Sequence, residues 1–335
     1  MTGGGDCAGL NAVIRAVVRK SEQFGYQVIG IRHGWAGLLT VDTIPLTWTD
    51  VHNIVNLGGT ILHTTRTNPF SRKDGPAAVL ANVKKLGLDA LVAVGGEDTL
   101  RVAAKLAPMG LKVVGVPKTI DNDIVATDVT FGFDSAVNVT VEAIDRILTT
   151  GESHDRIMVV EVMGMEAGWL AAYAGVASGA NLTLVPEEPF DLDDVASLLR
   201  KRHDQGATAS VVVVGEGCRL RGYSLGDPAK VDEFGHIRQG GIAELLAREI
   251  EKRTKIESRA VVLGHVVRGG APSAYDRILA TRLAVAAVQA IKNGEFGVMV
   301  CLRANAITSV PLSEILDKTK NLDEETLSLV KDFCR

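Results

Sequence analysis

The chain has 335 residues and a formal net charge of −4, a balance that excludes a strongly basic surface for nucleic acid or for anionic membranes. Hydrophobic residues make up 46% of the chain, aromatic residues only 4%, and the 35 glycines are typical of a glycine-turned α/β enzyme. No apolar run reaches bilayer length, the start lacks the order of a signal peptide, and the 4 cysteines form no C-x-x-C pair. We therefore expect a cytoplasmic protein with free thiols that binds neither nucleic acid nor membrane.

Short apolar segments alternate with segments of helical periodicity along most of the chain. The strand-like segments, rich in Val and Ile, are 26–31, 89–96, 111–117, 156–164, 181–186, 209–217, 259–265 and 297–302. Apolar positions recur with a helical period over 9–24, 76–86, 98–109, 134–150, 192–205, 239–254 and 273–293. This alternation predicts βαβ units in one or two doubly wound, mainly parallel sheets with strands buried on both faces.

The first glycine-rich turn, TGGGDCAG at 2–9, is preceded by Met1 alone. A doubly wound sheet would supply about five apolar residues there, so a trimmed chain, a start further upstream and a missing sheet edge are three open explanations. Because the glycines lead into a helix, Gly4 and Gly5 favour a backbone nest for an anion, with an ordinary tight turn as an equal alternative. The spacing matches neither a dinucleotide-binding fingerprint nor a Walker loop.

Two other Gly–Gly turns precede charged residues. Arg66 follows one of them among small polar residues, which favours an anion contact over a solvated surface role. In AVGGEDTL, at 93–100, the second turn leads from a predicted strand into Glu97 and Asp98 at the start of a predicted helix. The start of a helix after such a turn attracts phosphate. Two acidic residues at this place would repel phosphate, so their presence has to be explained.

The segment VPKTIDND, at 116–123, follows a predicted strand and carries alternating polar residues. In an extended segment, residues two apart point the same way, so Thr119, Asp121 and Asp123 would converge. One carboxylate could then accept a hydroxyl proton while another helps to hold Mg²⁺. A polar turn that ends the strand is the alternative.

Several motifs follow one another in an order that identifies a family. They are TGGGDCAGLNAVIR, VGGEDTL, VPKTIDND, FGFDSAV, SHDRIMVVEVMG, GEG and ESRAVVLGHVVRGGAPSAYDRILATR. In these motifs the chain resembles the 6-phosphofructokinases over nearly its whole length, and most of all the pyrophosphate-dependent members. The resemblance implies an α/β fold of two lobes, each a mainly parallel sheet flanked by helices. The larger lobe, approximately 1–132 with 239–300, would bind the donor phosphates, and the smaller, approximately 133–238 with 301–335, the sugar phosphate.

The implied reaction is a reversible, Mg²⁺-dependent transfer of phosphate from pyrophosphate to the 1-hydroxyl of fructose 6-phosphate, a step of glycolysis. Asp121 would be the general base, Lys118 would stabilise charge, and Glu97 and Asp123 would serve the metal. The resemblance assigns donor-phosphate contacts to Gly4, Gly5, Arg66, Asp98 and Lys118. It assigns sugar-phosphate contacts to Thr119, Ile120, Asp121, Arg156, Met163, Gly164, Met165, Glu216, Arg259, His265, Val266, Val267 and Arg268. Since Arg156 and Arg259 match arginines that reach into a neighbouring subunit, a homodimer or homotetramer is implied.

Asp98 would decide which phosphoryl donor is used. Family members that use ATP have glycine at this place, and the resemblance implies that Asp98 occupies the site of the α-phosphate of ATP. Two such charges about 4 Å apart repel by about 1 kcal/mol in water and by about 4 kcal/mol at an effective dielectric constant near 20. The larger value corresponds to about three decades in affinity, and pyrophosphate avoids it because it has no α-phosphate. Capping of the helix is the structural alternative for Asp98, and the two roles are compatible.

Met165 departs from the family, which usually has an arginine there, close to the transferring phosphoryl group. Loss of such a charge commonly lowers the rate by orders of magnitude, so catalytic competence is left open. An ATP-dependent 6-phosphofructokinase and a non-catalytic sugar-phosphate-binding relative are therefore two alternatives. Sedoheptulose 7-phosphate also stays open as a substrate, because it would present similar groups to the same arginines.

Overall fold

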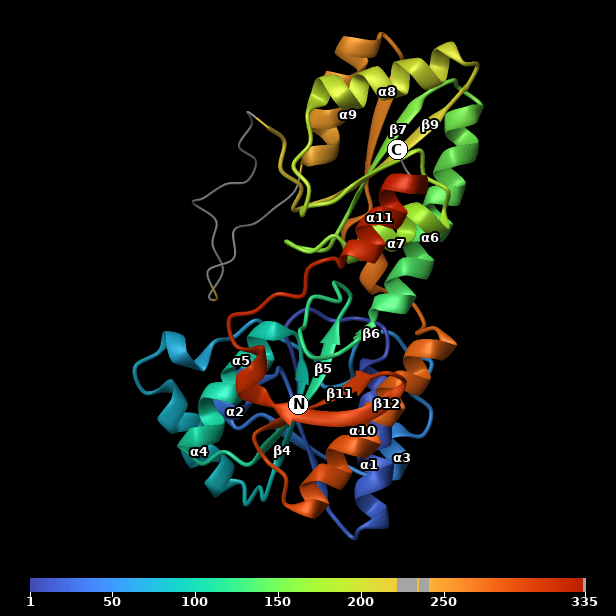
Figure 1. Ribbon diagram of the computed structural model, residues 1–335. Helices are drawn as coiled ribbons and strands as arrows, with labels where there is room; N and C mark the ends of the chain where they lie inside the picture. Colours follow the sequence, from blue (N-terminus) through green and yellow to red (C-terminus); the bar gives the residue numbers. More distant parts are fainter. Residues whose placement is uncertain (222–233, 235–240, 334–335) are drawn as a thin grey trace. The chain divides into compact units, whose positions relative to one another are not determined.

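The computed structural model describes residues 1–221, 234 and 241–333, which form two compact units (Figure 1). Unit 1 comprises Met1–Ile120, Ile124–Ser135 and Arg268–Thr319. Unit 2 comprises Asp121–Asp123, Ala136–Val267 and Lys320–Arg335. Neither unit is one continuous stretch of chain, so each of them brings together residues from distant parts of the sequence.

The core of unit 1 is a sheet with the strand order β1-β4-β5-β11-β12, and β6 also pairs with β5. Its strands are β1 (Thr2–Gly3), β4 (Leu91–Gly95), β5 (Val113–Thr119), β6 (Phe131–Gly132), β11 (Val298–Arg303) and β12 (Ala306–Pro311). Neighbours pair in parallel except β11 and β12, which are antiparallel. Every residue of β5 is buried, as expected for a central strand of a parallel sheet.

Helices surround this sheet (Figure 1), and two of them pack closely against its strands. Those of unit 1 are α1 (Leu10–Gln23), α2 (Trp35–Thr40), α3 (Trp48–Val51), α4 (Gly75–Lys85), α5 (Glu97–Leu106) and α10 (Ala274–Asn293). The helix α5 packs on β4 and β5, and α10 packs on α1, β5 and β11. The close approach of α5 depends on glycine, because a Cβ atom at Gly95 would lie 2.4 Å from Cβ of Thr99.

The segment 26–31 does not join the parallel sheet, and the prediction that it does is wrong. The strand β2 (Val28–Ile31) pairs with β3 (Thr43–Leu46) in a separate antiparallel sheet. Its residue Ile29 is 37% exposed, whereas Ile31 is 1% exposed, so this strand is not buried along its whole length. A short apolar segment by itself does not distinguish the two kinds of strand.

Unit 2 is built on a fully parallel sheet with the order β10-β7-β9-β8. Its strands are β7 (Ile157–Val162), β8 (Leu182–Leu184), β9 (Ser210–Gly215) and β10 (Ser258–Val262). Its helices are α7 (Trp169–Ala177), α8 (Leu192–Asp204), α9 (Ile242–Thr254) and α11 (Glu324–Phe333), together with most of α6 (Phe133–Glu152). The buried carboxylate of Glu161 accepts hydrogen bonds from the N–H groups of Gly241 (3.3 Å) and Ala243 (3.0 Å), which fixes the start of α9 on β7.

Besides Asp121–Asp123, which belong to unit 2, two longer segments lie in the other unit than the lobe that was expected to hold them. The helix α9 packs on β7 and β10, so it belongs to unit 2 and not to the lobe that was expected to hold 239–300. The strands β11 and β12 extend the sheet of β5, so they belong to unit 1 and not to the lobe expected at 301–335. The membership is decided by helix packing in the first case and by strand pairing in the second, and the sequence pattern specifies neither.

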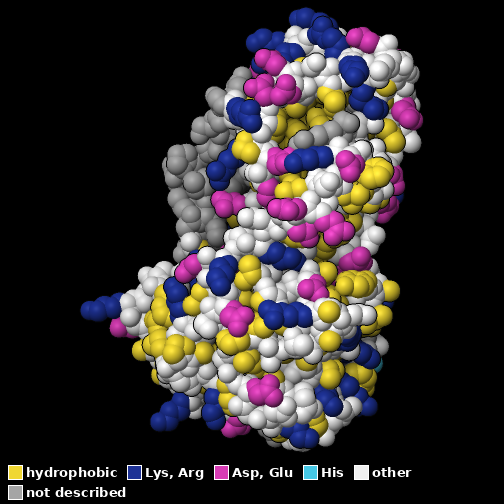
Figure 2. Space-filling view, viewed as in Figure 1, with side chains coloured by type: hydrophobic (Ala, Val, Ile, Leu, Met, Phe, Trp, Pro, Cys, Tyr) yellow, Lys and Arg dark blue, Asp and Glu magenta, His cyan; other side chains and the backbone are white. Residues whose placement is uncertain are grey.

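Several expectations from composition can be compared with the described residues. No helix within the described ranges is long and apolar enough to cross a membrane. Cys7, Cys218 and Cys301 are buried free thiols, whereas Cys334 lies outside the described residues. On the face drawn in Figure 2, acidic and basic side chains are interspersed over each unit, consistent with the small net charge.

Candidate functional site

The glycine turn after β1 is fastened to the loop that carries Arg66. Gly4 has a φ of 79°, its N–H donates to the carbonyl oxygen of Thr65 (3.1 Å), and its own carbonyl accepts from Oγ1 of Thr64 (2.6 Å). Arg66 itself is exposed. The amide of Gly4 is therefore directed at the protein, and an anion could use it only by replacing the bond to Thr65.

Two buried cations meet at Gly5. The Nζ atom of Lys118, whose residue is 4% exposed, donates to the carbonyl oxygen of Gly5. The guanidinium of Arg268 lies against the same residue, because a Cβ atom at Gly5 would be 1.7 Å from its Nη1. Arg268 is 8% exposed, and its buried Nε has no hydrogen-bond partner among the described residues. The turn at Gly5 is thus positively charged and includes a buried donor, Nε of Arg268, without a hydrogen-bond partner, which suits the binding of an anion.

The acidic start of α5 lies at the neighbouring strand end. Gly95 is in register with Pro117, and a Cβ atom at Gly96 would lie 3.5 Å from the carbonyl oxygen of Lys118. Glu97 and Asp98, which follow directly, form the first turn of α5. The structure therefore brings the two acids close to the strand end that carries Lys118.

Arg101 is a charged residue of this region that the sequence analysis missed. Its Nη2 forms an ion pair with Oε1 of Glu97, one helical turn earlier. The signal was present, because an acid followed four positions later by a base on a predicted helix is a common side-chain pair.

The segment from Thr119 to Asp123 is not extended, so the argument that Thr119, Asp121 and Asp123 converge by alternation is wrong. Asn122 has a φ of 52°, in the left-handed region, which breaks the alternation. Thr119 and Ile120 belong to unit 1, whereas Asp121–Asp123 belong to unit 2. Asp121 is only 7% exposed, and the carbonyl of Asp123 accepts from the N–H of Lys320 (2.8 Å).

In unit 2, the end of β9 holds the loop that follows β7. One oxygen of Glu216, Oε1, accepts from the N–H groups of Gly164 (3.2 Å) and Met165 (3.1 Å). Burial raises the pKa of Glu216, the bond from Met165 opposes this rise, and the charge of Asp121 adds to it. The loop also packs against Gly217, the residue after Glu216, since a Cβ atom at Gly217 would lie 1.8 Å from the carbonyl oxygen of Met165. Met163, Gly164, Met165 and Glu216, four of the predicted sugar-site residues, are thus neighbours.

Arg156 and Arg259 lie side by side at the beginnings of β7 and β10 and share an acid. Glu257 pairs with Nη2 of Arg156 (2.9 Å) and with Nη2 of Arg259. The hydrogen bond from Arg156 contributes most to holding the pKa of Glu257 below its ordinary value. A phosphate that bound between these arginines would take the place of Glu257.

The short helix Gly264–Arg268 carries the last predicted contacts. His265 is exposed, Val266 is 67% exposed, and Val267 is only 2% exposed. The side chain of Val267 is therefore part of the core, and no more than its backbone is available to a ligand. Arg268 belongs to unit 1, and the other residues of this helix belong to unit 2.

The residues at the start of α5 fit the magnesium ion that the resemblance implies. Among the described residues, no group of three or more His, Cys, Asp or Glu side chains could hold a metal ion by itself. Glu97 nevertheless supplies a carboxylate there, and Mg²⁺ in phosphoryl-transfer sites prefers one or two carboxylates together with phosphate oxygens.

Comparisons of sequence and structure agree with one another. Residues 1–291 match the family model described as "Phosphofructokinase". The chain is 53% identical to the pyrophosphate–fructose 6-phosphate 1-phosphotransferase of Amycolatopsis methanolica, over 97% of this chain and 96% of that protein. It is 47% identical to ATP-dependent 6-phosphofructokinase 3 of Streptomyces coelicolor, again over 97% of this chain and 96% of that protein.

Solved structures show the same fold. Phosphofructokinase of Pichia pastoris in the T-state superposes with a TM-score of 0.86 at 31% identity, covering 99% of this chain and 38% of the Pichia chain. The pyrophosphate-dependent phosphofructokinase of Marinobacter aquaeolei superposes with a TM-score of 0.84 at 21% identity, covering 99% of this chain and 90% of that one. The family model, the near full-length relatives and the shared fold lead to one conclusion: the chain belongs to the phosphofructokinase family.

Proposed function

We propose that this chain transfers phosphate from pyrophosphate to the 1-hydroxyl of fructose 6-phosphate, giving fructose 1,6-bisphosphate and phosphate. The observation that carries the proposal is Asp98, which directly follows Glu97 in the first turn of α5. A second acid at this place disfavours the α-phosphate of a nucleotide, a group that pyrophosphate does not have. The names of relatives about half identical to this chain support the same donor.

The phosphoryl donor would bind at the strand ends of unit 1. Lys118 and Arg268 supply positive charge at Gly5, and Arg66, which follows the residues that bind Gly4, would add to this charge. Glu97, with Asp123, would hold Mg²⁺, which when bound neutralises charge on the phosphate oxygens. Asp98 would exclude a longer polyphosphate chain.

The sugar phosphate would be held mainly by residues of unit 2. Arg156, Arg259 and His265 suit the 6-phosphate, because arginine binds phosphate with two parallel hydrogen bonds. The resemblance adds Arg268 to this set, whereas in the structure its guanidinium lies against Gly5. The carboxylate of Glu216 and the backbone of Met163–Met165 suit the sugar hydroxyls. Thr119, Ile120, Val266 and Val267 would complete the contacts. The reach of Arg156 and Arg259 into a neighbouring copy of the chain, as homodimer or homotetramer, is part of this proposal.

The chemical step needs a base and stabilisation of charge. Asp121 would accept the proton of the 1-hydroxyl while that oxygen attacks the terminal phosphorus of pyrophosphate. The bond between this phosphorus and the bridging oxygen then breaks, and the electron pair leaves with the second phosphate. Lys118 would stabilise the charge that develops on the transferring and leaving groups. Since the two phosphorylated compounds are close in phosphoryl potential, the reaction would run in both directions.

The test compares initial rates with fructose 6-phosphate and Mg²⁺ when pyrophosphate or ATP is supplied at matched concentration. We expect turnover with pyrophosphate only, and we expect Asp98→Gly to admit ATP. A rate with ATP in the unchanged protein would overturn the argument from Asp98. Replacing fructose 6-phosphate by sedoheptulose 7-phosphate in the same assay measures how strictly the sugar is selected.

Two alternatives have specific observations in their favour. The similar identity of ATP-dependent relatives keeps ATP as a second candidate donor. The presence of Met165 where the family usually has arginine favours a protein that binds sugar phosphate without turnover. Binding of fructose 6-phosphate with no rate for either donor would support this second alternative.

A further inference from the structure

Arg101 lies one helical turn after the acidic start of α5 and is surrounded by negative charge. Its guanidinium pairs with Glu97 and lies 4.0 Å from Oδ1 of Asp317. Burial by itself lowers the pKa of Arg101, but the hydrogen bond with Glu97 and the charges of Glu97, Asp98 and Asp317 outweigh this and raise it. The side chain is thus a permanent cation among carboxylates.

The pair with Glu97 is the one that holds this guanidinium. The side chains of Arg101 and Glu97 are 26% and 19% exposed, whereas that of Asp317 is 85% exposed and its pairing is screened by water. The Nε of Arg101 is buried and has no hydrogen-bond partner among the described residues. The head group is therefore fixed through Glu97.

The pair changes the charge that an incoming anion meets. Glu97 and Asp98 carry two adjacent negative charges in the first turn of α5, and Arg101 offsets that of Glu97. Mg-pyrophosphate is itself an anion, so an additional uncompensated carboxylate would repel it. One carboxylate oxygen of Glu97, Oε1, pairs with Arg101, and the other oxygen would bind the metal ion.

We propose that Arg101 is a positioning residue for the phosphoryl donor: it orients Glu97 and offsets its charge, so that Mg-pyrophosphate is accepted beside Asp98. The inference rests on the proposed function and adds a residue that sets affinity for the donor without touching the sugar.

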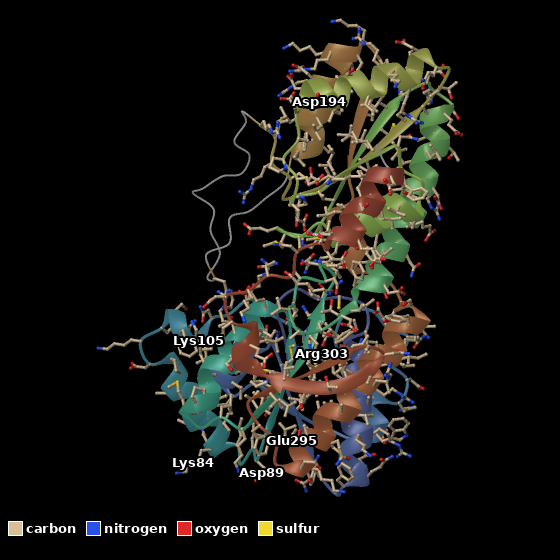
Figure 3. All side chains as sticks on the ribbon, viewed as in Figure 1. Lys84, Asp89, Lys105, Asp194, Glu295 and Arg303 are labelled. Carbon is tan, nitrogen blue, oxygen red and sulfur yellow. The ribbon has the colours of Figure 1, made fainter. Side chains whose placement is uncertain are left out.

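The test is Arg101→Gln, with Lys105→Gln as the matched control. Lys105, labelled in Figure 3, is the next residue along this side of α5, is exposed, and loses the same charge on substitution. We expect Arg101→Gln to raise KM for Mg-pyrophosphate about five- to tenfold, with kcat and KM for fructose 6-phosphate changed less than about threefold. Arg101→Lys, which keeps the charge, should restore most of the affinity.

Two further readouts separate a charge effect from a loss of packing. Calorimetry should show the same weakening of pyrophosphate binding in the presence of Mg²⁺, without any turnover. The ratio between variant and unchanged protein should shrink as salt is added, because salt screens charges.

The outcomes distinguish this inference from the proposed function. If the unchanged protein uses pyrophosphate and Arg101→Gln behaves like Lys105→Gln, the role of Arg101 is overturned alone. If the unchanged protein does not turn over pyrophosphate, the proposed function fails, whatever calorimetry shows for Arg101.

Discussion

Glu216 holds Met165 in a left-handed backbone conformation. The N–H of Met165 donates to Oε1 of Glu216 over 3.1 Å, and Met165 has a φ of 54°. A residue with a Cβ atom loses roughly 1–2 kcal/mol in this region, so the bond to the carboxylate offsets strain as well as satisfying a donor. The end of β9 therefore determines the shape of the loop that departs most from the family.

The first prediction separates the two roles of Glu216. Glu216→Gln keeps an acceptor oxygen for the loop but removes the charge, so we expect near-native stability with KM for fructose 6-phosphate raised about tenfold or more. Glu216→Ala removes the acceptor as well and should lower the free energy of unfolding by about 1–3 kcal/mol. Kinetics and urea unfolding measure the two effects. Equal loss of stability in both variants would contradict the prediction.

The second prediction concerns Met165 itself. Met165→Arg should raise kcat for pyrophosphate about tenfold or more, because a cation would then face the transferring phosphoryl group. Both residues carry the same backbone strain at this φ, so the fold should tolerate the change. Met165→Leu is the matched control, with no added charge, and should leave kcat within about threefold of the unchanged protein. No gain in kcat from Met165→Arg would indicate that Lys118 already supplies the necessary charge.

The pattern of apolar residues predicted the strands of the parallel sheets well and the other elements less well. The segments at 156–164 and 209–217 are β7 and β9, shortened at their ends. The strand β12 was missed because it alternates weakly and is mostly exposed at the sheet edge. The helix α7 was missed because it is apolar on nearly every side and shows no helical period.

The sequence predicted which residue types belong to the candidate site better than it predicted how these residues contact one another. The contacts of Lys118 and Arg268 with Gly5 join segments far apart in the sequence, and no local pattern encodes them. The turn at Asn122 had a local signal, because asparagine is enriched in the left-handed region. Whether these residues act as the family resemblance implies stays a prediction that the experiments above address.

The third prediction concerns the pH dependence of stability. Asp276 is fully buried, and its Oδ2 accepts from the N–H (2.8 Å) and the hydroxyl (2.6 Å) of Ser135. Burial raises the pKa of Asp276 from 3.8 to about 6. Asp276 therefore holds its proton more tightly in the folded state than in the unfolded state, and this preference stabilises the fold. The stabilisation is fully present below the unfolded pKa and is lost as the pH rises through about 6.

The variant Asp276→Asn isolates this contribution. We expect the free energy of unfolding of the unchanged protein, minus that of the variant, to fall by about 2 kcal/mol between about pH 4.5 and about pH 7.5. Urea unfolding at several pH values measures the difference. A difference that is constant with pH would show that Asp276 keeps an ordinary pKa in the folded protein.

The fourth prediction concerns the attachment of α9. Glu161→Ala leaves the N–H groups of Gly241, which is exposed, and of Ala243, which is buried, without their acceptor and should destabilise the protein by about 1–3 kcal/mol. Glu244→Ala is the control, because Glu244 lies in the first turn of the same helix but is exposed. It should change stability by no more than about 0.5 kcal/mol. Similar losses in urea unfolding would contradict a capping role for Glu161.

The interleaved order of the two units has a consequence for synthesis on the ribosome. All strands of the unit 2 sheet lie between Ile157 and Val262, so this sheet is complete in sequence before β11 and β12 have been made. The unit 1 sheet, although it contains the first residues of the chain, lacks β11, one of the strands that pair with β5, until residues 298–303 emerge. In the nascent chain β5 therefore lacks this later neighbour while the second sheet can already form, which reverses the usual N-terminal-first order of domain folding.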